Sequence, residues 1–219
     1  MDLLIGTLGV FASSWKQLLA FTGEHLFMSA SAILIAIAVG VPLAIWMTRN
    51  QRVAFMIQTT INAIQTIPTI SLLLIVMIFL GLGYGTAITA LALYSLLPIV
   101  QNTYAGLENV NKNLIEAGTG MGMTKLQLLT KVKIPLAMPI ILTGIRVATV
   151  VSIGAATMAT FVGAGGLGEM IMRGIVTTDD QKVLAGAIPA ALLVILVDLI
   201  LGKIEKRANF RLQMARAQK

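Results

Sequence analysis

The sequence predicts an all-α integral membrane protein with about five transmembrane helices. Apolar residues make up 57% of the 219-residue chain, charged residues only 11%, and the mean hydropathy is +0.90. Soluble domains carry about 25% charged and about 45–50% apolar residues, so this composition excludes an ordinary soluble enzyme. The lack of Cys and the single His also exclude a disulfide scaffold and thiolate or histidine-cluster metal sites. We therefore expect one membrane domain over residues 1–219, with its core at about 22–202 and no metal.

Charge-free runs locate the spans, because a helix needs about 20 apolar residues to cross a ~30 Å hydrocarbon core. The run from 53 to 107 is long enough for two helices, with a glycine-rich turn at 81–85. The five predicted spans are 26–48, 53–80, 86–106, about 147–168 with helix beginning a turn or two earlier, and 183–201. Helices are expected because the alternation of a membrane β-barrel is absent.

The first apolar stretch, Leu3–Ala12, is too short to span the membrane. No Lys or Arg precedes it, and Asp2 stands in front of it, which argues against a cleaved signal peptide. We expect an interfacial or re-entrant segment.

The basic residues predict the orientation. With five spans, one face of the membrane carries twelve of the 16 lysines and arginines and the other face carries three. The twelve are Arg49, Arg52, Lys112, Lys125, Lys131, Lys133, Lys203, Lys206, Arg207, Arg211, Arg216 and Lys219. The positive-inside rule then places the N-terminus outside and the C-terminus in the cytoplasm of a multi-pass cell-membrane protein. The net charge of +7 reflects this topology, so we expect the basic tail, 203–219, to contact anionic lipid, and no nucleic-acid partner.

The largest predicted cytoplasmic segment, 107–138, reads as a compact helix–turn–helix. A short helix is expected from Lys112, stopped by the glycines at 118, 120 and 122. Thr124 can cap a second helix, with Gln127 completing a capping box. The apolar residues expected on one face of this second helix are Leu126, Leu129 and Val132. A segment of this kind is expected to dock on another protein, and Pro135 and Pro139 lead on into the fourth span.

This segment resembles the E-A-A-x3-G-x9-I-x-L-P loop of ABC importer permeases. The matching residues are Glu116, Ala117, Gly118, Gly122, Val132, Ile134 and Pro135. Gly118 replaces the second Ala, Val132 replaces Ile and Ile134 replaces Leu. The resemblance implies the type I importer fold and a loop that couples the permease to cytoplasmic ABC ATPase subunits. No G-x4-G-K-[ST] loop occurs in the chain, so ATP and Mg²⁺ are expected on those partners, with no cofactor here.

Three further segments resemble the osmoprotectant permeases that carry glycine betaine, carnitine or choline. They are Gln65–Leu73, which contains Q-T-I-P, the glycine run Gly163–Gly168, and Leu184–Ala190. The resemblance implies a second permease chain, identical or paralogous, and an extracytoplasmic substrate-binding protein. Methionine permeases share a similar glycine run, so a methionine or other amino-acid importer is one alternative. An ion-coupled secondary transporter is another, although the inverted repeat is missing, the chain is short and intramembrane charges are scarce.

The glycine run also matches the G-x-G-x-x-G dinucleotide fingerprint. That interpretation fails because the run follows a membrane helix rather than a strand. Gly163, Gly165 and Gly166 are instead expected in a non-helical stretch at the outer face, either as a gate of the pathway or as a plain loop.

Polar residues inside the spans allow two interpretations. Thr59, Asn62, Thr66 and Thr69 recur at helical spacing beside Gln65, and Pro68 breaks the helix. They either face the translocation pathway or make hydrogen bonds between helices, and the second interpretation is favoured because no aromatic cage for a quaternary ammonium is evident.

The remaining polar residues of interest are ionisable. Arg146 and Asp198, near the cytoplasmic ends of the fourth and fifth spans, are expected to form a structural pair rather than an ion relay. His25 is expected at the membrane interface.

Overall fold

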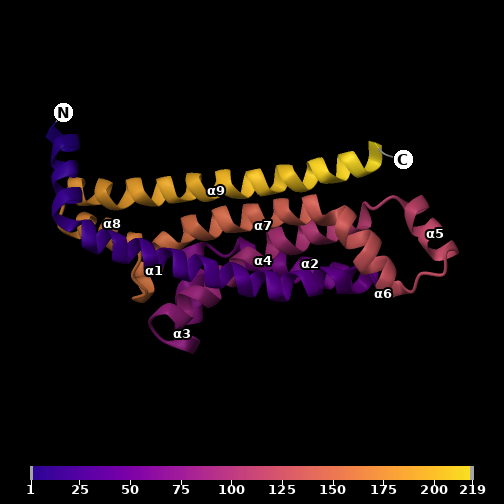
Figure 1. Cartoon of the computed structure of the whole chain (residues 1–219). Coiled ribbons are helices and arrows are strands. Elements are labelled where there is room, and N and C mark those ends of the chain that lie inside the picture. The colour runs from indigo at the N-terminus through magenta and orange to yellow at the C-terminus, as the bar shows by residue number, and fades with distance from the viewer. Residues whose placement is uncertain (1, 218–219) are drawn as a thin grey trace.

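The computed structural model describes residues 2–217, with side chains for residues 3–209, and every element in this range is helical. Four helices are long and apolar enough to cross a membrane, and a sharply bent helix pair brings the number to as many as five. The prediction of an all-helical protein with about five spans is confirmed. In Figure 1 the long helices run side by side along one direction, and the two ends of the chain lie at opposite ends of the bundle.

The elements in chain order are α1 (Asp2–Met47), α2 (Gln51–Thr66), α3 (Thr69–Leu80), α4 (Tyr84–Glu108), α5 (Lys112–Gly120), α6 (Lys125–Leu128), the π-helical turn η1 (Leu129–Lys133), α7 (Ile134–Ala156), the 3-10 turn η2 (Thr157–Val162), α8 (Leu167–Val176) and α9 (Asp180–Ala217).

Helix α1 starts well before the span predicted at Leu26. Its backbone is non-helical at Ser14, with φ −114° and ψ 17°, and the segment before this kink runs in a different direction from the rest of α1 (Figure 1). Val10 and Phe11 of this segment pack against a core cluster that includes residues of α8 and α9. The prediction began too late because Lys16 and Glu24 interrupt the charge-free run although they lie within the helix. The apolar stretch Leu3–Ala12 is the helical segment before the kink, and its interfacial position stays a prediction.

The second predicted span, 53–80, is not one straight helix. It consists of α2 and α3, and the chain bends by 103° between them. Ile67 is extended, with ψ 125°, and Pro68 has ψ 141°. Proline has no N–H to donate and disfavours helical geometry at the residue before it, so the helix ends at Thr66.

The fourth span begins at Ile134, about two turns before the earliest start that the sequence predicts, and continues the shorter helices α6 and η1 without a break. The helix starts earlier than predicted because Pro135 lies in its first turn and Pro139 lies inside it, although both were expected to end the preceding loop. At its other end α7 stops at Ala156, short of the predicted 168, and passes through η2 into the glycine run.

Two more differences concern the last third of the chain. Helix α8 was not predicted, because ten amphipathic residues between a glycine run and a span carry too little apolar length to stand out. Helix α9 extends the predicted span 183–201 in both directions, and most of the predicted basic tail continues it as helix.

Helix α4 lies at the centre and packs closely on its neighbours. A Cβ atom at Gly144 of α7 would lie 2.6 Å from the Pro98 carbonyl oxygen of α4, and one at Gly106 would lie 3.3 Å from that of Ala137. Small residues let membrane helices approach in this way. The main core cluster therefore joins α1, α3, α4 and η2 around small residues such as Ala87, Ala90 and Ala159.

Candidate functional site

The segment that resembles the coupling loop forms a compact tip at one end of the bundle, where Figure 1 shows α5 and α6 standing beyond the long helices. The Asn111 side chain caps α5 by accepting from the Asn113 N–H at 2.9 Å. The helix begins at Lys112, as predicted, and ends at Gly120, so Gly118 does not stop it. The chain turns instead at Met121 and Gly122.

The turn after α5 depends on one glycine. Gly122 has φ +78°, and its N–H donates to the Thr119 carbonyl at 2.9 Å. The Met123 N–H then reaches back to the Gly118 carbonyl at 3.1 Å. Together these bonds form a C-cap with a left-handed residue, the conformation that glycine adopts without strain.

The second helix begins as the sequence predicts. The Thr124 N–H donates to the Gln127 side chain at 2.9 Å, and the Gln127 N–H donates to the Thr124 hydroxyl at 3.3 Å, so the capping box is confirmed. The predicted apolar face is only partly right. Leu126 is 69% exposed, whereas Leu129 and Val132 are half-buried, because residues 129–133 form a π-helical turn rather than a regular α-helix.

The residues that match the family pattern divide between the exposed tip and its base. Glu116 and Ala117 on α5 are exposed, as is Gly122 in the turn. Gly118 is buried, and a Cβ there would lie 2.7 Å from the end of the Leu128 side chain. At the base, Val132 and Ile134 are half-buried and Pro135 is exposed at the start of α7. The tip thus presents the Glu116 carboxylate and three exposed large apolar side chains, Leu114 at 40%, Met121 at 72% and Leu126 at 69%.

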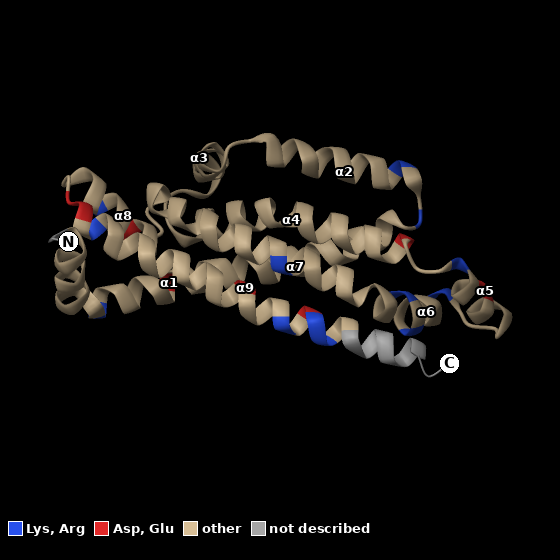
Figure 2. Ribbon diagram, turned by 90° about the horizontal axis from the view of Figure 1, so that it is seen from above, with Lys and Arg blue, Asp and Glu red and all other residues tan. Residues whose placement is uncertain are grey.

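Basic residues gather around this end of the bundle. Figure 2 shows lysines and arginines at α5, α6 and the far part of α9. They include Lys112, Lys125, Lys131, Lys133, Lys203, Lys206 and Arg207.

Polar residues of the broken helix pair bond mainly to α4. The Gln65 side chain donates to the Tyr94 carbonyl at 2.7 Å, and the Tyr94 hydroxyl donates to the Ile67 carbonyl at 2.7 Å. Gln101 of α4 donates to the Asn62 side chain at 3.1 Å. Two of the predicted pathway residues, Asn62 and Gln65, therefore bridge α2 to α4.

The remaining residues of this group are separated by the bend. Thr66 bonds within α2, to the Ala63 carbonyl at 2.7 Å. Thr69 lies beyond Pro68 on α3, so it does not continue the polar face of α2 as the helical spacing predicted. It instead lines an open hollow of about 600 Å³ between α3, α7 and η2, together with Met158 and Phe161.

The glycine run forms a non-helical loop, as predicted, and α1 holds it in place. Gly163, Gly165 and Gly166 have φ values of +70°, +73° and +81°. The Gly166 N–H donates to the Glu24 carboxylate at 2.8 Å. A Cβ at Gly165 would lie 2.5 Å from the same carboxylate, and the positive φ of this residue favours glycine in its own right. This role of Glu24 was not predicted, because the residue precedes the predicted first span, 26–48, although it lies within α1.

His25, which the sequence predicts at the membrane interface, is enclosed by protein. It is fully buried, and its Nε2 lies 2.9 Å from the Ile153 carbonyl of α7. From α1 it therefore reaches α7 and the glycine loop. A Cβ at Gly166 would lie 3.3 Å from the His25 Nδ1. The side chain therefore faces the neighbouring helices of the protein, and the position of His25 relative to the membrane interface stays a prediction.

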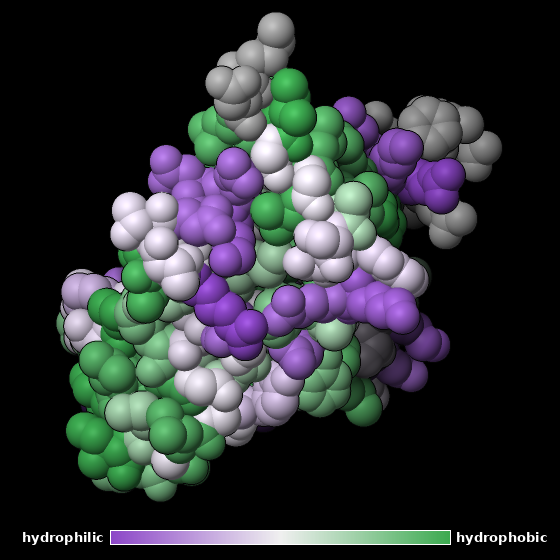
Figure 3. All heavy atoms as spheres, turned by 90° about the vertical axis from the view of Figure 1, so that its left-hand side faces the viewer, coloured by the Kyte–Doolittle hydropathy of each residue, from purple (hydrophilic) through white to green (hydrophobic). Residues whose placement is uncertain are grey.

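The end of the bundle opposite the tip is polar. Figure 3 faces this end and shows a band of hydrophilic residues between hydrophobic flanks. On α8, Glu169 accepts from the Thr160 hydroxyl at 2.7 Å and from Arg173 at 3.0 Å. The Thr160 hydrogen bond, followed by Arg173, lowers the pKa of Glu169 against the opposing effect of burial. A hollow of about 460 Å³ lies between α8 and the kinked part of α1.

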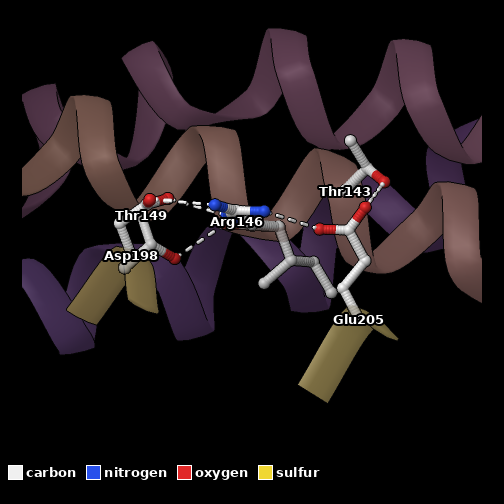
Figure 4. A network of polar contacts seen from close by, with 6 residues as sticks. Thr143, Arg146, Thr149, Asp198 and Glu205 are labelled. Atoms are coloured by element: carbon white, nitrogen blue, oxygen red, sulfur yellow. Dashed lines mark hydrogen bonds and ion pairs between the residues drawn. The ribbon is translucent and has the colours of Figure 1, made fainter. Parts of the chain in front are cut away.

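Arg146 and Asp198 form a bidentate ion pair between α7 and α9 (Figure 4). Arg146 Nε and Nη2 donate to Asp198 Oδ1 and Oδ2 at 2.7 and 2.8 Å. The pairing was expected from the sequence, but the participation of Glu205 was not. Its spacing of seven residues from Asp198 along one helix was the signal that could have revealed it.

Comparison with known proteins supports this picture. A family model described as binding-protein-dependent transport system inner membrane component matches residues 26–210. The carnitine transport permease protein OpuCD of Listeria monocytogenes is 42% identical over 210 residues, covering 95% of this chain and 94% of that protein. The glycine betaine/carnitine/choline transport system permease protein OpuCB of Bacillus subtilis is 43% identical over 193 residues, covering 88% and 89%.

Solved structures give the same fold. An inward-facing structure of the MetNI methionine ABC transporter matches with a TM-score of 0.79 at 23% identity, covering 88% of this chain and 96% of that one. An amino acid ABC transporter with histidines matches with a TM-score of 0.71 at 20% identity, covering 92% and 98%. At these identities the likeness concerns the fold, that of an ABC importer permease. The family model matches most of the chain, and the fold agrees with it. This multi-pass membrane protein therefore belongs to the binding-protein-dependent transport system inner membrane components.

Proposed function

We propose that this chain is the permease subunit of an ABC importer that carries a quaternary ammonium osmoprotectant, such as glycine betaine, carnitine or choline, into the cell. The substrate class rests on sequence similarity: permeases named for these compounds are 42–43% identical to this chain over 88–95% of its length. The fold of an importer permease supports the direction of transport.

ATP hydrolysis takes place on separate cytoplasmic subunits, and the tip formed by α5 and α6 docks on them. Glu116 offers a charge to a basic rim, while Met121 and Leu126 supply apolar contact area. Gly122 and the capping box fix the angle between the two short helices, so that the tip moves as one body. The concentration of lysines and arginines at this end supports its cytoplasmic location.

A second permease chain, identical or paralogous, completes the pathway, and a binding protein delivers substrate from outside. The exposed polar residues Asn62 and Thr66 support a pathway along α2, because exposed amide and hydroxyl groups within a span need protein or water rather than lipid around them. The clamped glycine loop lies at the opposite end from the tip, where a gate would open outward.

The decisive experiment uses the complete transporter in lipid vesicles with its binding protein. Glycine betaine, carnitine, choline and methionine are each tested for stimulation of ATP hydrolysis and for uptake. We expect at least one of the three quaternary amines, and not methionine, to do both. Stimulation by methionine alone would overturn the substrate class, and uptake that persists without ATP on an ion gradient would overturn the transporter class.

A further inference from the structure

The ion pair between Arg146 and Asp198 is part of a larger network between α7 and α9 (Figure 4). Arg146 Nη1 donates to Glu205 Oε2 at 3.0 Å, and the Thr143 hydroxyl donates to Glu205 Oε1 at 2.7 Å. All four oxygens of the two carboxylates thus accept a hydrogen bond from α7. Charge-assisted bonds of this bidentate kind are directional, so they fix the position of one helix relative to the other.

The surface of α9 is shaped to receive the guanidinium group. Asp198, Gly202 and Glu205 are spaced by four and three residues, so they share one face of the helix. A Cβ at Gly202 would lie 3.0 Å from Arg146 Cζ. The missing side chain therefore leaves room for Arg146 to lie across α9 between the two acids.

The network also sits on the helix that leads to the tip. Helices α6, η1 and α7 follow one another without a break from Lys125 to Ala156, so Thr143 and Arg146 lie on the helix that continues the second tip helix through a π-helical turn. Among residues 3–209, the side-chain hydrogen bonds that join α9 to another span all belong to this network. Its other contacts with the spans are packing contacts.

Packing alone defines helix register poorly in a membrane, because lipid tails solvate an apolar helix face as well as a neighbouring helix does. We propose that Arg146, held by Asp198 and Glu205, is a positioning residue that locks the register of α9 on α7, so that movement of the tip is passed to α9 without slippage. This inference rests on the proposed function, because it assigns the network a role in coupling ATP hydrolysis to transport.

The test uses two variants that retain the net charge of the network. Arg146→Lys keeps the positive charge but lacks the planar fork that binds Asp198 and Glu205 together. Gly202→Ala removes no charge and places a methyl group against the guanidinium. Gly23→Ala is the matched control, because a Cβ at this α1 glycine meets nothing within 4 Å.

Substrate transported per ATP hydrolysed is measured in vesicles for the complete transporter. For Arg146→Lys and Gly202→Ala we expect the ratio to fall by about tenfold, a size typical of coupling between sites, with basal ATP hydrolysis and assembly unchanged. Gly23→Ala should keep the wild-type ratio. A merely structural role predicts less assembled transporter with the ratio unchanged, and a wild-type ratio in either variant overturns the proposal.

A distance measurement tests the lock itself. The chain has no cysteine, so spin labels can be placed on introduced cysteines at the exposed positions Val147 and Leu199 of α7 and α9. We expect one narrow distance distribution with and without nucleotide, and a broadened one in Arg146→Lys. An equally narrow distribution in that variant contradicts the lock. If the wild-type transporter takes up no quaternary amine at all, the proposed function fails instead, whatever the distances show.

Discussion

Gly122 is the residue on which the geometry of the tip depends most directly. Its φ of +78° is a left-handed conformation, which costs an L-residue with a side chain about 1–2 kcal/mol. Space is not the constraint, because a Cβ at this position meets nothing within 4 Å. The requirement for glycine at this position is therefore one of backbone conformation.

Gly122→Ala should consequently destabilise the turn by about 1 kcal/mol and speed hydrogen exchange at the Met123 amide, whose bond to Gly118 closes the turn. Gly120→Ala is the matched control, since Gly120 lies in α5 and its Cβ also meets nothing within 4 Å. Exchange as slow as in the wild type after Gly122→Ala would show that the turn tolerates a side chain.

Glu116 should act through its charge, because it is exposed and its replacement disturbs no core. Glu116→Lys is expected to abolish uptake and substrate-stimulated ATP hydrolysis while the chain still reaches the membrane. Glu116→Gln should lose less, because it keeps the size and the acceptor. Normal uptake by Glu116→Lys would remove Glu116 from the docking surface.

At the residue scale, the sequence predicted features that depend on neighbours in the chain and missed those that depend on tertiary contacts. The Thr124 capping box was predictable because both partners lie within four residues. The burial of His25 and the contact of Glu24 with Gly166 join positions more than 120 residues apart, and no local pattern records them.

The bend between α2 and α3 is the element-scale feature that the sequence revealed only in part. Pro68 predicts a break, but the 103° angle depends on α4, where the Tyr94 hydroxyl bonds to the Ile67 carbonyl and Gln65 bonds to the Tyr94 carbonyl. The sequence contains the proline, yet the groups that hold the bend lie some 27 residues further along the chain.

Tyr94→Phe should therefore loosen the bend without filling or emptying space. We expect a loss of about 1 kcal/mol, the usual contribution of a single hydrogen bond, measured as a lower midpoint of thermal unfolding in detergent. Tyr104→Phe serves as control, since the Tyr104 ring packs against a core cluster of α1, α2 and α4. Equal midpoints for the two variants would contradict this role of Tyr94.

The boundaries of α7 show why charge alone misplaces a span. Arg146 ended the predicted apolar run, but Asp198 and Glu205 pair with it where α7 meets α9, so the helix continues through it. A charged residue marks the end of a span only when no partner on another helix compensates it.

At the scale of the whole molecule, the predicted orientation has a direct test. Met121 at the tip and Val176 at the end of α8 are 72% and 73% exposed, so cysteines introduced there are equally accessible to a reagent. With an impermeant maleimide on intact cells, we expect Val176→Cys to react and Met121→Cys to react only after permeabilisation. The reverse pattern would invert the topology.

The fold class was predictable from the hydropathy of the sequence, and the tip from a motif whose residues lie close together in the chain. The packing of α4 at the centre and the α7–α9 network were not, because both depend on which helices become neighbours.

The measurement that tests the account most directly is uptake of a quaternary amine into vesicles that contain this permease with and without its ATPase subunits. We predict accumulation only when the ATPase subunits and ATP are both present on the side of the membrane that the tip faces. Accumulation in vesicles that lack the ATPase subunits would contradict the account.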